Sequence, residues 1–142
     1  MITIILYGRP QAQKRPRFKR VGIRKYDYEI GSFVRTYNPD YKAHQKIRQE
    51  IMQQYQDKPL TGPLKVKFTF LFAPPMASMK KTQAMLDGRI YKTTKPDTSN
   101  MIKLYEDLMN KIVYKDDAQI VYEKGFKKYA LEEKTIIEIT EL

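Results

Sequence analysis

Three carboxylates and a lysine that could support chemistry lie late in this basic chain. Asp97 precedes a helical pattern, Lys103 lies within it, and Asp116 and Asp117 follow it. Cleaving a phosphodiester requires stabilisation of a crowded anionic transition state, and Mg²⁺ provides this when carboxylate and phosphate oxygens bind it. A nearby lysine can neutralise developing charge or orient the nucleophile. These residue types therefore indicate metal-assisted phosphodiester cleavage as a candidate chemistry.

One helix is expected to position these groups. The pattern predicts it from Asp97 to Ile112, with an N-terminal cap at its first or second residue. An apolar stripe suited to the core consists of Met101, Leu104, Tyr105, Leu108 and Ile112. Asn100, Lys103 and Asp107 share a neighbouring face at spacings of three and four. That face borders the core, so its side chains need not be fully exposed.

Each of these residues also has an ordinary structural explanation. Asp97 could be a helix cap, and Asp116 with Asp117 could form a polar turn. Lys103 and Asp107 could form a surface ion pair four residues apart. Spacing alone leaves the metal-site interpretation and the structural one open.

The segment that carries these residues resembles a family signature. It has Lys-Pro-Asp-Thr-Ser-Asn from Lys95, then Lys103 and Asp107, and Asp-Asp-Ala-Gln-Ile from Asp116. This is similar to the RusA crossover junction endodeoxyribonucleases, whose pattern is K-P-D-x-D-N, a lysine three residues on, an aspartate four beyond, and D-D-x-Q-[IV]. The similarity is dense over residues 95–128 and weaker across the rest of the chain.

The resemblance implies a homodimeric α+β resolvase that uses a divalent metal to place paired nicks across a four-way DNA junction. It implies that Asp97 and Asp117 bind the metal and serve catalysis, with Asp116 as the first acid of the pair. Lys103 matches the catalytic lysine, and Asn100 is expected to contact DNA. The implied ion is Mg²⁺, or Mn²⁺ in its place, and no small-molecule cofactor is expected.

Ser99 departs from the family pattern, because the second aspartate of that pattern stands at this position. A hydroxyl is a neutral and weaker ligand for Mg²⁺ than a carboxylate. Either Asp97, Asp116 and Asp117 bind the metal while Ser99 holds a water, or activity is reduced, or the chain was altered. Branched-DNA binding without cleavage is therefore an alternative function.

Net charge points to a polyanionic partner. Lys and Arg number 27 against 16 Asp and Glu, which gives +11, and the pI is about 9.7. A domain this basic typically binds nucleic acid. The remaining alternatives are a basic surface kept for solubility and a basic interaction module in which the acids are only structural.

A basic arm or loop is predicted at about residues 11–37, because this stretch lacks a sustained apolar period. The side chains expected to bind DNA phosphates are Lys14, Arg15, Arg17, Lys19 and Arg20.

The remaining patterns complete an α+β domain that spans residues 1–142. Strands are predicted at 2–7, 64–72, 119–128 and 135–140, and helices at 41–55 and about 81–86. This order favours a mixed sheet with the two main helices, 41–55 and 97–112, packed on one face. The apolar strand residues and the first helix are candidates for a dimer interface.

Several site classes and locations are disfavoured. The chain has no cysteine and a single histidine, His44, so thiolate and histidine-rich metal sites are excluded. No apolar run approaches the ~18 residues of a membrane helix, and the apolar N-terminus lacks the basic flank of a signal peptide. We therefore expect a cytoplasmic protein without a membrane partner.

Overall fold

The computed structural model describes residues 1–14, 17–25, 28–37 and 40–142. Within 17–25 and 28–37 it describes the backbone strands only.

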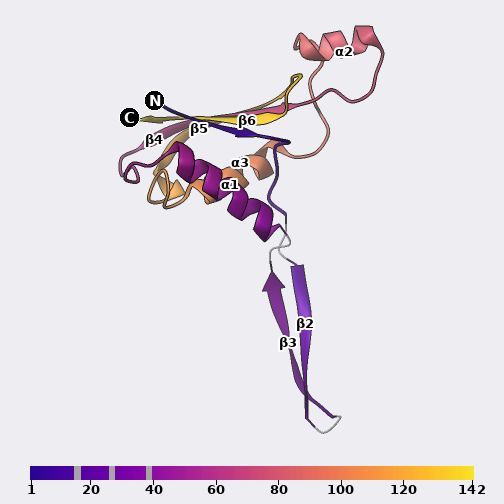
Figure 1. The fold of residues 1–142 in the computed structure, drawn as a ribbon, viewed down its shortest axis with the longest axis vertical. Coiled ribbons are helices and arrows are strands. Elements are labelled where there is room, and N and C mark those ends of the chain that lie inside the picture. The colour runs from indigo at the N-terminus through magenta and orange to yellow at the C-terminus, as the bar shows by residue number, and fades with distance from the viewer. Residues whose placement is uncertain (15–16, 26–27, 38–39) are drawn as a thin grey trace.

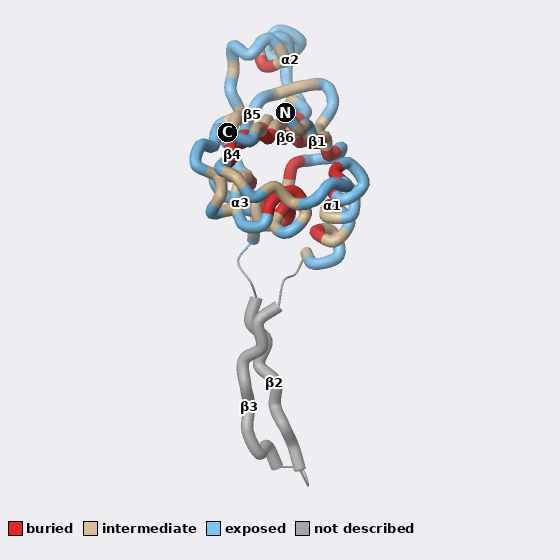
Figure 2. The backbone as a smooth tube through the Cα atoms, turned by 90° about the vertical axis from the view of Figure 1, so that its left-hand side faces the viewer, coloured by how far each residue is buried: buried red, intermediate tan, exposed pale blue. Residues whose placement is uncertain are grey.

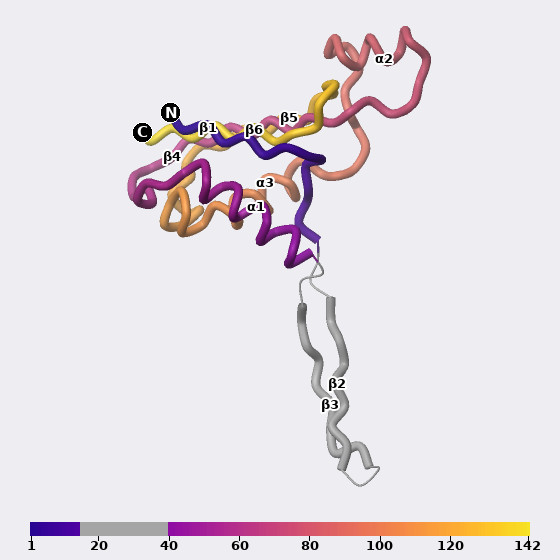
Figure 3. The backbone as a smooth tube through the Cα atoms, viewed as in Figure 1, coloured from indigo at the N-terminus to yellow at the C-terminus, as the bar shows by residue number. Residues whose placement is uncertain are grey.

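A mixed four-stranded sheet forms the frame of the protein. Its strands lie in the order β1 (Ile2–Tyr7), β6 (Lys134–Glu141), β4 (Leu64–Phe72) and β5 (Ile120–Tyr129). β6 runs antiparallel to β1 and β4, whereas β5 runs parallel to β4. The first and last strands of the chain therefore lie side by side (Figure 3). This sheet confirms the predicted α+β class.

Two helices cover one face of the sheet. α1 (Tyr41–Gln54) and α3 (Thr98–Met109) both lie on the same side of it (Figure 1). The parallel pair β4 and β5 is joined by the crossover that contains α3, which brings that helix back onto the sheet. Both predicted main helices are thus confirmed.

The core lies between the sheet and these helices, where the buried residues concentrate (Figure 2). Alternate residues of β4 point into it, and Phe68 and Phe70 stack with ring centroids 5.9 Å apart. Because Val66, Phe68 and Phe70 are fully buried within one chain, these apolar strand residues cannot serve as the expected dimer interface.

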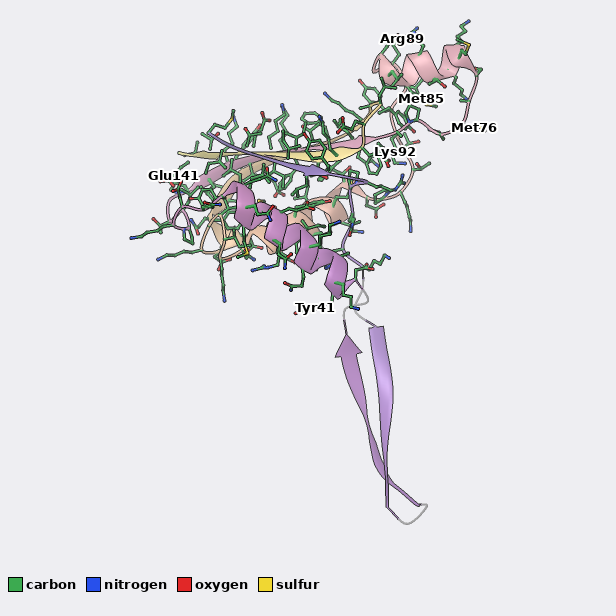
Figure 4. All side chains as sticks on the ribbon, in the orientation of Figure 1. Tyr41, Met76, Met85, Arg89, Lys92 and Glu141 are labelled. Carbon is green, nitrogen blue, oxygen red and sulfur yellow. The ribbon has the colours of Figure 1, made fainter. Side chains whose placement is uncertain are left out.

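α2 (Met79–Leu86) lies beyond the end of the sheet, and the predicted short helix is confirmed. The hydroxyl of Ser78 caps it by accepting a hydrogen bond from the Lys81 backbone N–H at 3.2 Å. Met85 is buried, whereas Met76, which precedes the helix, is fully exposed (Figure 4).

The basic arm contains more regular structure than the sequence predicts. β2 (Arg17–Lys25) pairs antiparallel with β3 (Tyr28–Tyr37) in a separate two-stranded sheet. A ribbon outside the main sheet needs no apolar face, so its strands lack the alternation that identifies the other strands. The β-branched and aromatic residues interleaved with its basic residues still favour an extended backbone.

α3 ends earlier than predicted, at Met109 instead of Ile112. Lys111 adopts a positive φ of 66°, and its backbone N–H donates to the Tyr114 carbonyl at 2.7 Å, which closes a turn. Four of the five stripe residues are buried in the helix as expected. No helix in the described part of the chain is long and apolar enough to cross a membrane.

Candidate functional site

Asp97 stands at the start of α3 without the usual role of a capping side chain. Its backbone is extended (φ −69°, ψ 137°), and its carboxylate makes no capping hydrogen bond. The side chain is exposed, and the one hydrogen bond that it accepts from the described residues is long, 3.4 Å, from Nδ2 of Asn100. The structure therefore leaves this carboxylate free for a ligand instead of using it to cap the helix.

The turn that presents Asp97 is fastened to β5. Nζ of Lys127 donates to the Thr94 carbonyl at 2.8 Å and to the Pro96 carbonyl at 3.1 Å. Gly125 lies beneath the first turn of α3, where an added Cβ would stand 2.6 Å from Cδ1 of Ile102. Both residues place the start of α3 close against the sheet.

The outward face of α3 carries Ser99 and Lys103, and both side chains are exposed. Lys103 makes no ion pair within 4 Å among the described residues, so the i,i+4 pair with Asp107 is not formed. Asp107 is half-buried and accepts a hydrogen bond from Nε2 of Gln13 at 3.2 Å. The lysine ammonium thus remains available to an anion.

The chain leading from β1 to the basic arm runs along α3. The Gln11 N–H donates to the Tyr105 hydroxyl at 2.9 Å, and the Gln13 N–H donates to the Asn100 carbonyl at 3.1 Å. These bonds place the root of the arm beside the family signature.

A cleft of about 860 Å³ opens between this segment, the start of α1 and residues 95–100. Its lining includes the cations of Arg9, Lys14 and Lys95 and the carboxylates of Asp40 and Asp97. Mixed charge with cations in excess suits a phosphate group that lies beside a carboxylate.

Asp116 and Asp117 lie in a tightly constructed turn. A short 3₁₀ helix, Asp117–Gln119, has Asp116 as its cap, and the Asp116 carboxylate accepts from the Ala118 N–H at 3.1 Å. Oε1 of Gln119 accepts in return from the Asp116 N–H at 2.9 Å. Nε2 of Gln119 also donates to the Leu60 and Gly62 carbonyls, both at 3.0 Å. The glutamine of the signature therefore fixes the acidic pair onto the loop after α1.

The two aspartates titrate differently because of this geometry. Hydrogen bonds from the Ala118 N–H and from the Asp117 carboxyl lower the pKa of Asp116. The pKa of Asp117 is raised, first by its hydrogen bond with Asp116 and then by desolvation and the nearby negative charges. The pair thus concentrates negative charge that a cation would relieve.

A further acidic pair adjoins Asp117. Burial raises the pKa of Glu106 to about 8, and a hydrogen bond with the Glu123 carboxyl adds to the shift. The charges of Asp117 and Asp107 raise it further. Glu106 on α3 and Glu123 on β5 therefore meet close to the acidic turn.

The predicted metal ligands lie in two places. Asp97 and Ser99 lie at the start of α3. Asp116 and Asp117 instead lie near the acids at the end of this helix, because Asp117 and Asp107 contribute to the raised pKa of Glu106. In the described part of the chain, no three Asp, Glu, His or Cys side chains converge as a cage for a metal ion. This donor set fits Mg²⁺, which is usually bound through one or two carboxylates, with water and substrate phosphate completing its shell.

The predicted DNA-binding residues are described only in part. Lys14 is exposed, and its Nζ lies 3.3 Å from Oδ2 of Asp40. Arg15 lies outside the described residues, as do the side chains of Arg17, Lys19 and Arg20.

Four further residues of the site were not identified from the sequence: Gln13, Glu106, Glu123 and Lys127. No sequence signal marks them, because their contacts cross between distant segments. The role of Gln119 had a signal, since Asp-x-x-Gln has the spacing of a capping box.

Known proteins resemble this chain over most of its length. The family model described as "Endodeoxyribonuclease RusA" matches residues 7–140. "Uncharacterized protein YqaN" of Bacillus subtilis (strain 168) is 28% identical over 146 residues, which cover 99% of this chain and 96% of that protein. "Crossover junction endodeoxyribonuclease rusA" of Lactococcus phage r1t is 28% identical over 122 residues, which cover 85% and 86% respectively.

Proposed function

Because this chain belongs to the RusA endodeoxyribonuclease family, we propose that it is a metal-dependent endonuclease that resolves four-way DNA junctions by paired nicks. One structural observation supports this most directly. The Asp97 carboxylate of the family signature does not cap its helix and instead lines a cleft with three cationic side chains.

Each residue of the signature would have its own role in this reaction. Mg²⁺ or Mn²⁺ would bind at Asp97, with Ser99 holding one of its waters, and at the Asp116–Asp117 pair. When bound, the ion would neutralise charge on the scissile phosphate and help to generate the nucleophile. Lys103 would donate to a phosphate oxygen, since its ammonium is exposed and has no acidic partner within 4 Å among the described residues.

The basic arm would bind DNA without taking part in the chemistry. Its root, Lys14, lines the same cleft as Asp97, and the hydrogen bonds of Gln11 and Gln13 hold that root against α3. Lys14, Arg15, Arg17, Lys19 and Arg20 would therefore contact phosphates on either side of the cut. Asn100, whose side chain also lines the cleft, would orient the backbone near Asp97.

The test is a nicking assay with a labelled synthetic four-way junction and a linear duplex of the same sequence. Each substrate is incubated with Mg²⁺, with Mn²⁺ and with EDTA. We expect paired, symmetric nicks in the junction that require the metal, and little cutting of the duplex. Equal cutting of both substrates, or cutting in EDTA, would contradict the proposal.

A second candidate is a junction-binding protein that does not cleave. Ser99 favours it, because the site lacks the second carboxylate of the family pattern, and no three acids converge in the described residues. In that case the same assay would give no nicks with either ion, while a gel-shift assay would still show preference for the junction over the duplex.

A further inference from the structure

The sheet has a second face, opposite α1 and α3, and no helix in the described part of the chain packs along it (Figure 1). We call it the outer sheet face. Pairing registers place on it Thr3, Ile5 and Tyr7 of β1, Lys134, Ile136, Glu138 and Thr140 of β6, Lys65, Lys67, Thr69 and Leu71 of β4, and Tyr122, Lys124, Phe126 and Lys128 of β5.

This face is strongly basic. Its lysines are Lys65, Lys67, Lys124, Lys128 and Lys134. Among the strand residues on it, all of which the structure describes, Glu138 is the one acid, so the face carries five positive charges minus one, +4. Glu138 pairs with Lys67 at 3.7 Å and leaves the other four lysines unopposed on this face.

The charges are arranged in rows. The sheet register aligns Lys67 with Lys124, and Lys134 and Lys128 with Leu71 between them. A row of apolar and hydroxyl side chains separates these two rows, with Ile136 beside Thr69. Lys65 and Lys67 are two residues apart on one strand, which spaces them by about 7 Å. Regular rows of cations on a firm sheet can match the repeat of a phosphate backbone.

Aromatic rings are interleaved with these lysines. Three ammonium groups lie over the Phe126 ring, those of Lys67, Lys124 and Lys128, at 5.8, 5.2 and 5.4 Å from its centroid. Tyr122, which is 49% exposed, has the Lys65 ammonium 5.2 Å from its ring centroid. Such contacts hold the ammonium groups together over the sheet, so the positive charge is concentrated there.

From this pattern we propose that the outer sheet face binds the phosphate backbone of a second segment of DNA. A second copy of the chain is a poor occupant, because a two-fold contact of this face with itself would bring ten lysines together against two glutamates. A surface kept only for solubility would normally mix charges of both signs. A DNA backbone, in contrast, matches both the positive charge of this face and the arrangement of its lysines in rows.

The inference rests on the proposed function, because it assigns a further part of a branched substrate. Ser99 and Lys103 of the signature lie on the outward side of α3, and α3 packs against the opposite face of the sheet. A DNA backbone bound at the candidate site would therefore be separated from the outer sheet face by two layers, the helix α3 and the sheet itself. The outer sheet face would hold another arm of the junction.

The experiment measures junction binding in EDTA by fluorescence anisotropy over a series of salt concentrations. The variant Lys65→Gln/Lys124→Gln/Lys128→Gln removes three exposed charges from the face. The matched control, Lys58→Gln/Lys80→Gln/Lys81→Gln, removes three exposed charges elsewhere. We expect the slope of log affinity against log salt to fall by about 2 to 3 in the first variant, at roughly 0.9 per lost phosphate contact, and by less than about 1 in the control.

A labelling experiment locates the contact independently. Because the chain has no cysteine, Tyr122→Cys and the control Lys58→Cys each introduce a single thiol. Junction DNA should slow maleimide labelling at position 122 several-fold and leave position 58 unchanged. Equal salt slopes for both triple variants, or protection by a second protein copy without DNA, would overturn the inference. Neither result bears on the proposed function, which the nicking of the junction by the parent protein tests.

Discussion

At the scale of single residues, the carboxylates of Asp97 and Asp117 differ in their surroundings but should be equally necessary. We expect Asp97→Asn or Asp117→Asn to slow nicking by about 100-fold or more. Junction binding should persist or tighten, because each change removes a negative charge near the DNA backbone. Asp97→Asn should leave the melting temperature nearly unchanged, since this carboxylate does not cap α3.

These two variants need a matched comparison. Asp57→Asn removes an exposed carboxylate from the connector after α1 and should nick at the parental rate. Lys103→Ala should lower the rate strongly with a smaller effect on affinity. An Asp97→Asn protein that nicks as fast as its parent would rule out the proposed site.

Ser99 provides a gain-of-function test at the same scale. Ser99→Asp restores the carboxylate of the family pattern on an exposed position of the first turn of α3. Negative charge at a helix N-terminus is favourable, so the change should not destabilise the fold. We expect it to lower the metal concentration needed for half-maximal nicking several-fold. Ser99→Ala is the control, and an unchanged metal requirement would show that the other carboxylates suffice.

Glu106 predicts how stability depends on pH. Its pKa is about 8 in the folded chain, above its ordinary value of 4.5. Between these values the unfolded chain releases the proton while the folded chain keeps it, so stability should fall as pH rises through this range and level off above about pH 8. In EDTA, Glu106→Gln should therefore melt a few degrees higher than the parent near pH 8.

The control for this prediction is the difference in melting temperature between Glu106→Gln and the parent, measured across the pH range. That difference should disappear below about pH 4.5, where the carboxyl is protonated in both states. Glu132→Gln, at an exposed turn position, should show no such trend. A constant offset at every pH would indicate an effect unrelated to ionisation.

The residues of the site could be predicted only where they lie together in one short segment of the sequence. Asp97, Lys103 and Asp116 could be found because the signature is nearly continuous in sequence. The meeting of Glu106 with Glu123 could not, because it depends on β5 returning beside α3 after a turn of unknown geometry.

At the scale of elements, the site depends on how closely α3 approaches β5. A Cβ at position 125 would stand 2.6 Å from Cδ1 of Ile102 and 3.2 Å from Cγ2 of Thr98. Gly125→Ala should therefore destabilise the protein by about 1–3 kcal/mol and displace the turn that carries Asp97. Thermal melting and the nicking rate would measure the two effects.

A second substitution makes this packing prediction specific. Ile102→Val removes the Cδ1 atom that the new methyl would meet, so Gly125→Ala/Ile102→Val should regain much of the lost stability and activity. A double variant no better than Gly125→Ala would show that the strand itself, and not the contact with α3, requires glycine.

The strands and helices of the main domain were predictable from the sequence, whereas the hairpin was not. β4 has apolar residues at every second position, and α3 has an apolar stripe at helical spacing. Both elements were located from these patterns. The segment of the β2–β3 hairpin was expected as a basic arm or loop without assigned strands, because a separate ribbon has no core-facing alternation to recognise. The end of α3 could not be predicted, because it depends on the positive φ of Lys111 and a lysine does not indicate this conformation.

At the scale of the whole molecule, one chain presents one candidate site, whereas resolving a four-way junction requires two coordinated cuts. A closed two-fold dimer, the commonest oligomer, would supply two equivalent sites. The buried residues of β4 cannot form the contact, and the charge of the outer sheet face opposes it. The first helix, with Tyr41 and Met52 exposed, stays a candidate, and the exposed apolar side chains near α2, Met76, Met79 and Tyr91, are a second one.

We therefore expect light scattering at micromolar concentration to give twice the 16.9 kDa chain mass, both free and bound to junction DNA. Met76→Lys/Met79→Lys should shift the free protein toward monomer, because each change would desolvate a charge at the contact. The monomer should then cut junctions singly, with the second nick delayed. Lys80→Glu/Lys81→Glu, on the same helix, is the control for a general disturbance of α2. A parent protein that remains monomeric on the junction would contradict the dimer.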